Sequence, residues 1–425
     1  MADATSSSTI KSSVSMSPDQ EQPPVYEKRV LVTGGAGFIG SHVVTHLVKR
    51  YPQYYIVNLD SLDYCSCVRN VHTAISQSAS SRAGADGERD GHSAATATST
   101  GSEAADDQDE DLEDDDVGTR LRGSFCEWDQ LDAANELIAR LPRNYKFIKG
   151  SILSADLVAY VLQTEQIDTI LHFAAQSHVD NSFGNSLAFS QTNILGTHVL
   201  LEAARVHAKI NRFVHVSTDE VYGEGIAAAA ETPPMTEDHV LEPTNPYAAS
   251  KAGAEFLVKA YQRSFRLPTV ITRSNNVYGP WQYPEKLIPK FINQLARGRP
   301  VTIHGASGQH TRNYLYISDV VAAFDVVLHK GEIGHVYNIG GSNEVSNRQV
   351  ADRPFNDLRY TIDAAKLRAL GWQEHVSWQD GLRRTVKWYA RFGHRFGSID
   401  QALEAHPLAF KKTYDLLPGT TGGSE

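Results

Sequence analysis

Three side chains that can exchange protons stand side by side near the middle of the chain. The segment FVHVSTDEVYG, residues 213–223, is apolar at first and then presents Thr218, Asp219 and Glu220 in succession. An aspartate at such a position could simply cap the helix that follows. Paired carboxylates can also act as a general acid and a general base, and open α/β sheets bind ligands at the carboxyl ends of their strands. We therefore predict an acid and a base at the end of a buried parallel strand.

A glycine-rich segment near the start of the chain predicts a nucleotide site. VTGGAGFIGSH, residues 32–42, spaces Gly34, Gly37 and Gly40 as G-x-x-G-x-x-G after an apolar run, and the next run ends at Asp60. Glycines let the backbone approach a pyrophosphate at a helix N-terminus, and the acid accepts hydrogen bonds from a ribose 2′-hydroxyl. A carboxylate would repel a 2′-phosphate, so NAD is favoured over NADP. A tight turn without a ligand is the alternative.

Tyr247 and Lys251 form a second candidate pair. Their i, i+4 spacing in PYAASKAGAEF places them on one face of a helix, where the lysine would favour the phenolate and make the tyrosine a base. The Y-x-x-x-K pattern alone is common on amphipathic helices. Together with Ser217 and Thr218 at the end of the preceding run, it resembles the tyrosine, lysine and hydroxyl set of the extended short-chain dehydrogenases.

The segment STDEVYG, residues 217–223, narrows this resemblance to one subfamily. Most extended members are not acidic beside the hydroxyl, whereas STDEVYG is typical of the nucleotide-sugar 4,6-dehydratases. The chain is similar to the eukaryotic dTDP-glucose 4,6-dehydratases over about residues 28–72 and 144–390. Six further segments support the resemblance: HFAAQSHVD (172–180), TNILGTHVLLEAAR (192–205), PTNPYAASKA (243–252), NNVYGPWQYPEKLIPKFI (275–292), QHTRNYLYISDV (309–320) and DRPFNDLRY (352–360).

This resemblance implies a hydro-lyase with a role for each of five side chains. Tyr247 would take the proton of the sugar C4 hydroxyl while NAD+ accepts the hydride, and Thr218 would bind the C4 oxygen. Glu220 would remove the C5 proton, and protonated Asp219 would donate to the departing C6 hydroxyl. Lys251 would also bind the nicotinamide ribose. One carboxyl must be protonated while its neighbour is ionised, so we expect the pKa of Asp219 to be raised.

Further ligand contacts are implied motif by motif. Ser151 stands where the family has an acid that meets the adenine amino group, so weaker NAD affinity is expected. The chain lacks a helix and a strand that relatives have between Asn347 and Asp352, which shortens the lobe over the diphosphate. Arg312 suits that diphosphate because a guanidinium forms paired hydrogen bonds. The expected NAD contacts are Gly34, Gly37, Phe38, Ile39, Gly40, Asp60, Ser151, Ile152, Ala174, Ala175, Thr192, Tyr247 and Lys251. The expected substrate contacts are Ser177, Thr218, Asn275, Lys286, Leu287, Arg312, Asn347, Asp352 and Arg353.

His42 and His46 lie four residues apart, a spacing that can bind a metal. No acidic ligand or H-E-x-x-H motif accompanies them, and the implied mechanism requires no metal. We predict no metal site.

The elements that position these residues follow from hydrophobic patterning. Short apolar runs alternate with helical patterns, which is typical of a doubly wound parallel sheet of the Rossmann type. Beyond about Val277 the alternation fades, which predicts a smaller mixed lobe for the substrate. The predicted strands begin at Lys28, Tyr54, Tyr145, Ile167, Arg212 and Pro268, and the predicted helices span Phe38–Arg50, Ala155–Gln163, Ser190–His207 and Tyr247–Ser264. The predicted divisions are a disordered tail at 1–26, the NAD-binding domain at 27–276, the substrate lobe at 277–395 and a C-terminal tail at 396–425.

Charge is concentrated in one segment. Residues 103–116 hold ten acidic side chains and no basic one, which equals the whole formal net charge of −10. The remainder is neutral, so nothing favours nucleic acid as a partner. The surrounding residues, about 74–120, are poor in aromatic side chains and predict a disordered acidic insertion. An acidic segment that binds a partner is the alternative.

Other composition data predict the compartment. No apolar run approaches 20 residues, so no membrane partner is expected. Cys65, Cys67 and Cys126 are too few for a disulfide framework, and the N-terminal residues resemble neither a secretory signal nor a transit peptide. We predict a cytoplasmic enzyme, and the resemblance implies a homodimer whose substrate is a sugar nucleotide.

Three alternative functions remain at this point. UDP-glucose is the next substrate after dTDP-glucose. A UDP-sugar 4-epimerase or decarboxylase shares the glycine motif, Tyr247 and Lys251, but Asp219 and Glu220 argue against it. A catalytically idle NAD-binding scaffold, with the acidic insertion for partner recognition, would retain NAD and turn over no sugar nucleotide.

Overall fold

A computed structural model of the 425-residue chain describes residues 24–83, 141–223, 233–299, 311–342, 344–346, 361–396 and 400–403. Most of the predicted insertion and both predicted tails lie outside these residues, as do Asn347, Asp352 and Arg353. Among the described helices, each falls short of the length or the apolarity that crossing a membrane requires.

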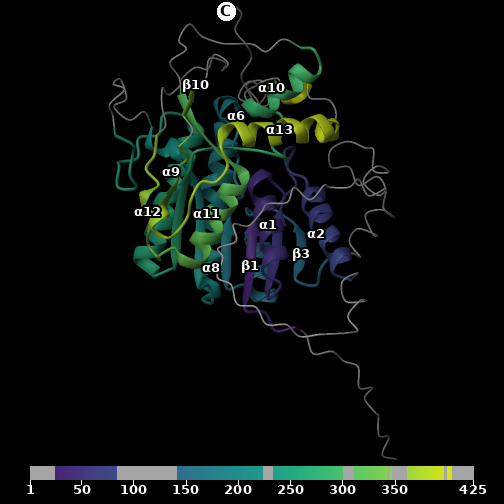
Figure 1. Cartoon of the computed structure of the whole chain (residues 1–425). Helices are drawn as coiled ribbons and strands as arrows, with labels where there is room; N and C mark the ends of the chain where they lie inside the picture. Colours follow the sequence, from purple (N-terminus) through teal and green to yellow (C-terminus); the bar gives the residue numbers. More distant parts are fainter. Residues whose placement is uncertain are drawn as a thin grey trace, which may run out of the picture.

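The body of the molecule is a seven-stranded parallel sheet in the order β3-β2-β1-β4-β5-β6-β9 (Figure 1). The predicted doubly wound sheet is confirmed. The chain order reverses at β1, with β2 on one side and β4 on the other, which places the ligand crevice at the carboxyl ends of these strands. The strands span Lys28–Thr33 (β1), Tyr54–Asp60 (β2), Tyr145–Lys149 (β3), Thr169–His172 (β4), Arg212–Thr218 (β5), Thr269–Ser274 (β6) and Val336–Ile339 (β9).

Helices cover both faces because the strands are apolar on both. In β1, Val30 and Val32 pack in one core with Leu47, whereas Leu31 packs in the opposite core with Leu200. Successive side chains of a strand alternate between faces, so one apolar strand supplies both cores. The first face is covered by α1 (Phe38–Arg50), α2 (Val68–Ala83) and α11 (Ile317–Lys330), and the second by α5 (Ala155–Thr164), α8 (Gly196–His207) and α9 (Pro246–Phe265).

A second, three-stranded sheet lies beyond the carboxyl edge. Its order is β10-β8-β7, with β7 parallel and β10 antiparallel to β8. Asn275 alone separates β6 from β7, so this sheet begins where the main sheet ends. In Figure 1, α10, α13 and β10 lie together at one end of the molecule. The bounds are Asn276–Tyr278 (β7), Thr311–Tyr316 (β8), Glu344–Ser346 (β10), Leu287–Ala296 (α10), Ala365–Ala369 (α12), Trp378–Phe392 (α13), Gly393–Phe396 (η3) and Asp400–Leu403 (α14).

Three boundaries differ from the sequence predictions. Both β9 and α11 come from 277–395, yet β9 joins the main sheet and α11 packs on one of its faces. This range is therefore not a separate lobe throughout. Helix α2 continues to Ala83, past the predicted start of the insertion at 74. The predicted helix Ser190–His207 begins with a π-helical turn, η1 (Ser190–Leu195), and continues as α8. Two short helices precede it, α6 (Val179–Gly184) and α7 (Ser186–Phe189). Periodicity shows neither sheet neighbours nor helix type, which explains these differences.

Candidate active site

The Thr218 hydroxyl at the end of β5 caps the helix that follows, so neither carboxylate is needed as the cap. Thr218 has extended backbone angles, and its side-chain oxygen accepts a hydrogen bond of 3.3 Å from the Glu220 amide. It thereby caps a short 3-10 helix, η2, that spans Asp219–Tyr222. The capping explanation therefore applies to Thr218, whereas Asp219 and Glu220 form the first turn of the capped helix.

The carboxyl of Asp219 is buried, and its raised pKa lets it hold a proton near neutral pH. Only 2% of the residue is exposed, and the Asn275 side-chain amide donates to its Oδ2 at 2.7 Å. Burial, followed by the negative charge of Glu220, raises the pKa of Asp219 to about 7, against the opposing effects of Asn275, Thr218 and Arg312. The expected elevation of this pKa is present, and its main cause is desolvation.

Glu220 is tied to the helix that carries the candidate base. The Asn245 side-chain amide donates to its Oε2 at 3.0 Å, while the Asn245 Oδ1 accepts the Ala248 amide at 2.8 Å and so caps α9. Pro246 occupies the first turn, where its missing amide proton costs nothing. Sequence reasoning missed Asn245, although N-P before a helical pattern is a signal for a helix cap.

Tyr247 and Lys251 lie on α9 and are both buried. A hydrogen bond joins Tyr247 to Thr218, but burial and the charge of Glu220 raise the pKa of the phenol. The Lys251 ammonium donates to the Val216 carbonyl of β5 at 2.6 Å, and burial lowers its pKa to about 8. The expected electrostatic depression of the Tyr247 pKa is therefore wrong for this arrangement, because the phenol is desolvated beside an anion.

The glycine segment forms a close turn between β1 and α1. Gly34 has a φ of +70°, and a Cβ on it would lie 2.6 Å from the Ala174 amide nitrogen. A Cβ on Gly40 would lie 2.3 Å from the Gly34 carbonyl oxygen. Side chains are thus excluded where α1 begins, and the backbone there is open to a pyrophosphate. The residues present fit a dinucleotide.

Asp60, at the end of β2, holds this turn in place. Its carboxylate accepts the Ala36 amide at 2.9 Å and the Leu62 amide at 2.8 Å. Only 4% of the residue is exposed, and burial raises its pKa. Each carboxylate oxygen can accept more than one hydrogen bond, so Asp60 retains capacity for a ribose hydroxyl.

The other expected cofactor residues follow β3 and β4 at the same sheet edge. The Ser151 hydroxyl accepts the Leu153 amide at 3.2 Å, and Ile152 is buried beside Gly196. Ala174 and Ala175 follow β4 and are half-buried. Also half-buried are Phe38 and Ile39 in α1 and Thr192 in η1, while Gly37 is the N-cap of α1.

Two of the expected substrate residues connect segments that follow the main sheet's carboxyl edge. The Lys286 ammonium donates to the Ser177 main-chain oxygen at 2.6 Å, which connects the loop after β4 to α10, where Leu287 is the first residue. Arg312 lies in β8 opposite Val345 and lowers the pKa of Asp219, so its charge acts on the sheet edge that carries the candidate acid.

An asparagine that sequence reasoning missed supports the floor of the site. Asn193 donates to the Ser250 hydroxyl at 2.8 Å and to the Gln176 carbonyl at 3.0 Å, and its Oδ1 accepts the Gln176 amide at 2.8 Å. It lies in the π-helical turn η1, a type of turn that is frequent at functional sites. A buried asparagine within an amphipathic pattern was the available signal.

Comparisons with known proteins agree with this arrangement. The family model described as GDP-mannose 4,6 dehydratase matches residues 113–385. The chain belongs to this dehydratase family. The family predicted from the sequence is confirmed, as is the predicted fold.

Relatives in the dehydratase family differ in length and in the nucleotide they are named for. The dTDP-D-glucose 4,6-dehydratase of Homo sapiens is 39% identical over 410 residues, which cover 91% of this chain and 97% of the relative. A trifunctional UDP-glucose 4,6-dehydratase, 3,5-epimerase and reductase of Arabidopsis thaliana is 46% identical over 420 residues, which cover 94% of this chain and 52% of the relative. The chain thus spans about half the length of that plant relative.

A solved structure shows the same architecture. The dTDP-glucose 4,6-dehydratase DesIV from Streptomyces venezuelae, crystallised with NAD, superimposes with a TM-score of 0.65 at 35% identity. The match covers 86% of this chain and 98% of DesIV.

The two histidines of α1 have separate partners in this family member. The His42 ring stacks on Trp281 with centroids 4.2 Å apart and its Nε2 meets the Pro280 carbonyl, whereas His46 pairs with Asp325. Among the described residues, no group of three metal-ligating side chains was found.

Proposed function

We propose that this chain is an NAD-dependent dTDP-glucose 4,6-dehydratase. The observation that carries the proposal is the pair Asp219 and Glu220, in which burial raises the pKa of one carboxyl to about 7 beside a second, partly exposed carboxyl. A protonated acid and an ionised base at one sheet edge are what the elimination of water requires beyond oxidation. The glycine turn and Asp60 provide the matching dinucleotide cradle.

Oxidation at C4 is assigned to α9 and β5. Tyr247 takes the proton of the C4 hydroxyl, and Thr218, which hydrogen-bonds the phenol, binds the C4 oxygen. Lys251 lies one turn after Tyr247 and binds the nicotinamide ribose. The dinucleotide, when bound, would supply the hydride acceptor for C4 in its oxidised form and the hydride donor for C6 in its reduced form. The pKa of Tyr247 is raised in the structure, so ligand charges must favour the phenolate.

Elimination is assigned to η2. The C4 ketone acidifies the C5 proton, and the Glu220 carboxylate removes it. Asp219, protonated near neutral pH, donates its proton to the departing C6 hydroxyl, which leaves as water. Asn275 and Thr218 hold the Asp219 carboxyl in place for this step. This elimination leaves a double bond between C5 and C6. Addition of a hydride at C6, with return of the proton to C5 from Glu220, gives a 4-keto-6-deoxy sugar on the same nucleotide.

UDP-glucose is the second candidate substrate. The plant relative named for UDP-glucose is 46% identical to this chain, against 39% for the human relative named for dTDP-glucose. The proposed contacts to the sugar nucleotide are Arg312, Lys286 and Ser177. Three further proposed contacts, Asn347, Asp352 and Arg353, lie outside the described residues. An epimerase needs only the α9 pair and leaves Asp219 and Glu220 without a role.

The test is incubation of the purified chain with dTDP-glucose and, separately, UDP-glucose. Mass spectrometry follows the loss of water, and alkaline absorbance follows the 4-keto product. We expect dehydration of dTDP-glucose, with a higher kcat/KM than for UDP-glucose. A reversed order assigns the UDP sugar, a C4 epimer assigns the epimerase, and bound NAD without turnover of either assigns the scaffold.

We also propose a homodimer in the cytoplasm. Leu187, Leu195 and Phe256 are each more than half exposed on α7, η1 and α9, three elements that adjoin. Exposed apolar side chains on neighbouring elements are suited to a second copy of the chain. Sedimentation should show a dimer that Phe256→Asp dissociates and Val240→Asp, in an exposed loop, leaves intact. The low cysteine content supports the location, which a fluorescent fusion tests.

A further inference from the structure

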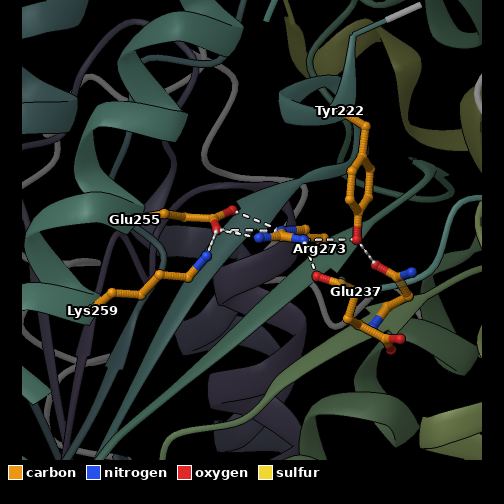
Figure 2. Close-up of polar contacts among 6 residues, drawn as sticks. Tyr222, Glu237, Glu255, Lys259 and Arg273 are labelled. Carbon is orange, nitrogen blue, oxygen red and sulfur yellow. Dashed lines mark hydrogen bonds and ion pairs between the residues drawn. The ribbon is translucent and has the colours of Figure 1, made fainter. Parts of the chain in front are cut away.

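A buried ion pair behind the candidate site is used by no step of the mechanism. Arg273 of β6 and Glu255 of α9 have fully buried side chains, and Nη2 lies 2.7 Å from Oε2 while Nε donates to Oε1 at 3.0 Å (Figure 2). Lys259 adds a second cation at 3.7 Å from Oε2. Burying charges is costly even when they are paired, so core packing alone does not explain this choice of residues.

The other edge of the same guanidinium holds η2. The Arg273 Nη1 donates to the Tyr222 hydroxyl at 2.8 Å and to the Glu237 main-chain oxygen at 3.1 Å. The Tyr222 hydroxyl donates in turn to Asn338 Oδ1 of β9 at 2.8 Å. Figure 2 shows Glu255 and Tyr222 on opposite sides of Arg273.

Both anchored elements carry candidate catalytic groups. Tyr222 is the last residue of η2, which contains Asp219 and Glu220, and Glu255 lies on α9 one turn after Lys251. A guanidinium is planar and rigid, and its donors point in fixed directions, so it sets the spacing between two partners in a way that a flexible ammonium does not.

We propose that Tyr222, held by Arg273, is a positioning residue that fixes the two carboxylates of η2 relative to Tyr247 and Lys251 of α9. A helix of one turn has few hydrogen bonds of its own; here the Thr218 cap and the bond from the Gly223 amide to the Glu220 carbonyl are its local supports. The Tyr222 hydroxyl adds the connection to the rigid sheet. The kinetic part of this inference rests on the proposed function, and its structural part does not.

The test variant is Tyr222→Phe, which removes one hydroxyl and leaves the Arg273–Glu255 pair and the Glu237 contact in place. Its matched control is Tyr337→Phe, which removes an equally buried hydroxyl, the acceptor of the Glu332 amide, on the strand next to β6. The Tyr222 hydroxyl makes two hydrogen bonds and the Tyr337 hydroxyl makes one. Urea unfolding of both variants therefore measures how much general stability each one loses.

Two partial reactions separate positioning from stability. Single-turnover absorbance of the reduced cofactor reports oxidation, and deuterium incorporation at C5 in heavy water reports elimination. A displacement near 1 Å can cost on the order of a hundredfold in rate. We expect Tyr222→Phe to slow C5 exchange by about tenfold to a hundredfold, to change oxidation by less than about threefold, and to leave KM similar. Equal slowing of both steps, or rates like those of Tyr337→Phe, would overturn the inference.

Hydrogen–deuterium exchange of the intact chain provides a readout without catalysis. The amides of Glu220 and Gly223 are expected to exchange faster in Tyr222→Phe and at the native rate in Tyr337→Phe. Unchanged exchange in Tyr222→Phe rejects the positioning role whether or not the chain dehydrates a sugar. If the native chain shows no turnover but these amides lose protection, the proposed function fails and the positioning of η2 stands.

Discussion

Asn245 connects Glu220 to the helix that carries Tyr247: its side-chain amide donates to the Glu220 carboxylate at 3.0 Å, and its oxygen caps α9. The cap fixes which end of the side-chain amide faces Glu220, because only the oxygen can accept the Ala248 amide. The candidate C5 base and the candidate C4 base therefore share one support.

Substituting Asn245 by aspartate should separate these two roles. Asn245→Asp can still cap α9, but it cannot donate to Glu220 and places a second negative charge beside it. We expect thermal stability close to native and kcat lowered at least about tenfold, with the onset of activity shifted to higher pH. Asn245→Ala should instead lose about 1 kcal/mol of stability as well. A native pH–rate profile for Asn245→Asp would contradict the support of Glu220 by this residue.

The buried carboxyl of Asp219 predicts a falling limb in the pH–rate profile. Its pKa is raised to about 7, so the protonated form that donates to the C6 hydroxyl disappears above neutral pH. We expect kcat for dehydration to decrease above about pH 7 while single-turnover oxidation does not follow the same limb. Asp219→Asn should abolish elimination at every pH and leave no such limb to measure. An elimination rate that is flat from pH 6 to about pH 9 would argue against Asp219 as the acid.

The raised pKa of Asp219 also makes the free energy of unfolding depend on pH. Between the usual aspartate pKa of 3.8 and about 7, the folded state binds a proton at Asp219 that the unfolded state lacks. The free energy of unfolding should therefore decrease as pH rises through this window, by about 4 kcal/mol at most. Urea unfolding of native and Asp219→Asn chains at pH 5 and pH 8 would show a smaller loss in the variant. Asp156→Asn, at an exposed carboxylate in α5, is the control.

The close turn at Gly34 predicts loss of NAD binding in Gly34→Ala. The new Cβ would lie 2.6 Å from the Ala174 amide nitrogen, and the turn would have to open. We expect NAD affinity to fall at least about tenfold, measured by cofactor retained on the purified chain and by titration. Gly298→Ala is a matched control, since Gly298 also has positive φ but no atom within 4 Å of its Cβ position. The control should lose about 1 kcal/mol of stability and keep NAD. Equal retention of NAD by both variants would contradict the proposed cradle.

We predict that Ser151→Asp increases the affinity for NAD. Ser151→Asp would restore an acceptor of full charge at the position where the resemblance expects an acid toward the adenine amino group. We expect the Kd for NAD to decrease about tenfold, the effect of one charge-assisted hydrogen bond. Ser154→Asp, at the exposed N-cap of α5, is the control, because it adds the same charge at a position that the resemblance does not assign to NAD. An unchanged Kd for Ser151→Asp would remove this residue from the cofactor contacts.

Local patterns were sufficient to predict six of the seven strands of the main sheet and the candidate reactive residues. The six predicted strands and the glycine turn depend on short apolar runs and on residues close in sequence, where steric rules act directly. Thr218, Asp219 and Glu220 are adjacent, and Tyr247 and Lys251 share one helix face. Their spacing alone therefore determined which groups lie together within each element.

Tertiary structure decided what depends on contacts between distant elements. The pairing of β9 with β6, the support of Glu220 by Asn245 and the bridge from Arg273 to both Glu255 and Tyr222 join residues that are far apart in the chain. The pKa values followed the same rule: burial raised that of Tyr247, although Lys251 stands one turn away. Desolvation depends on everything packed around a group, and no sequence spacing records it.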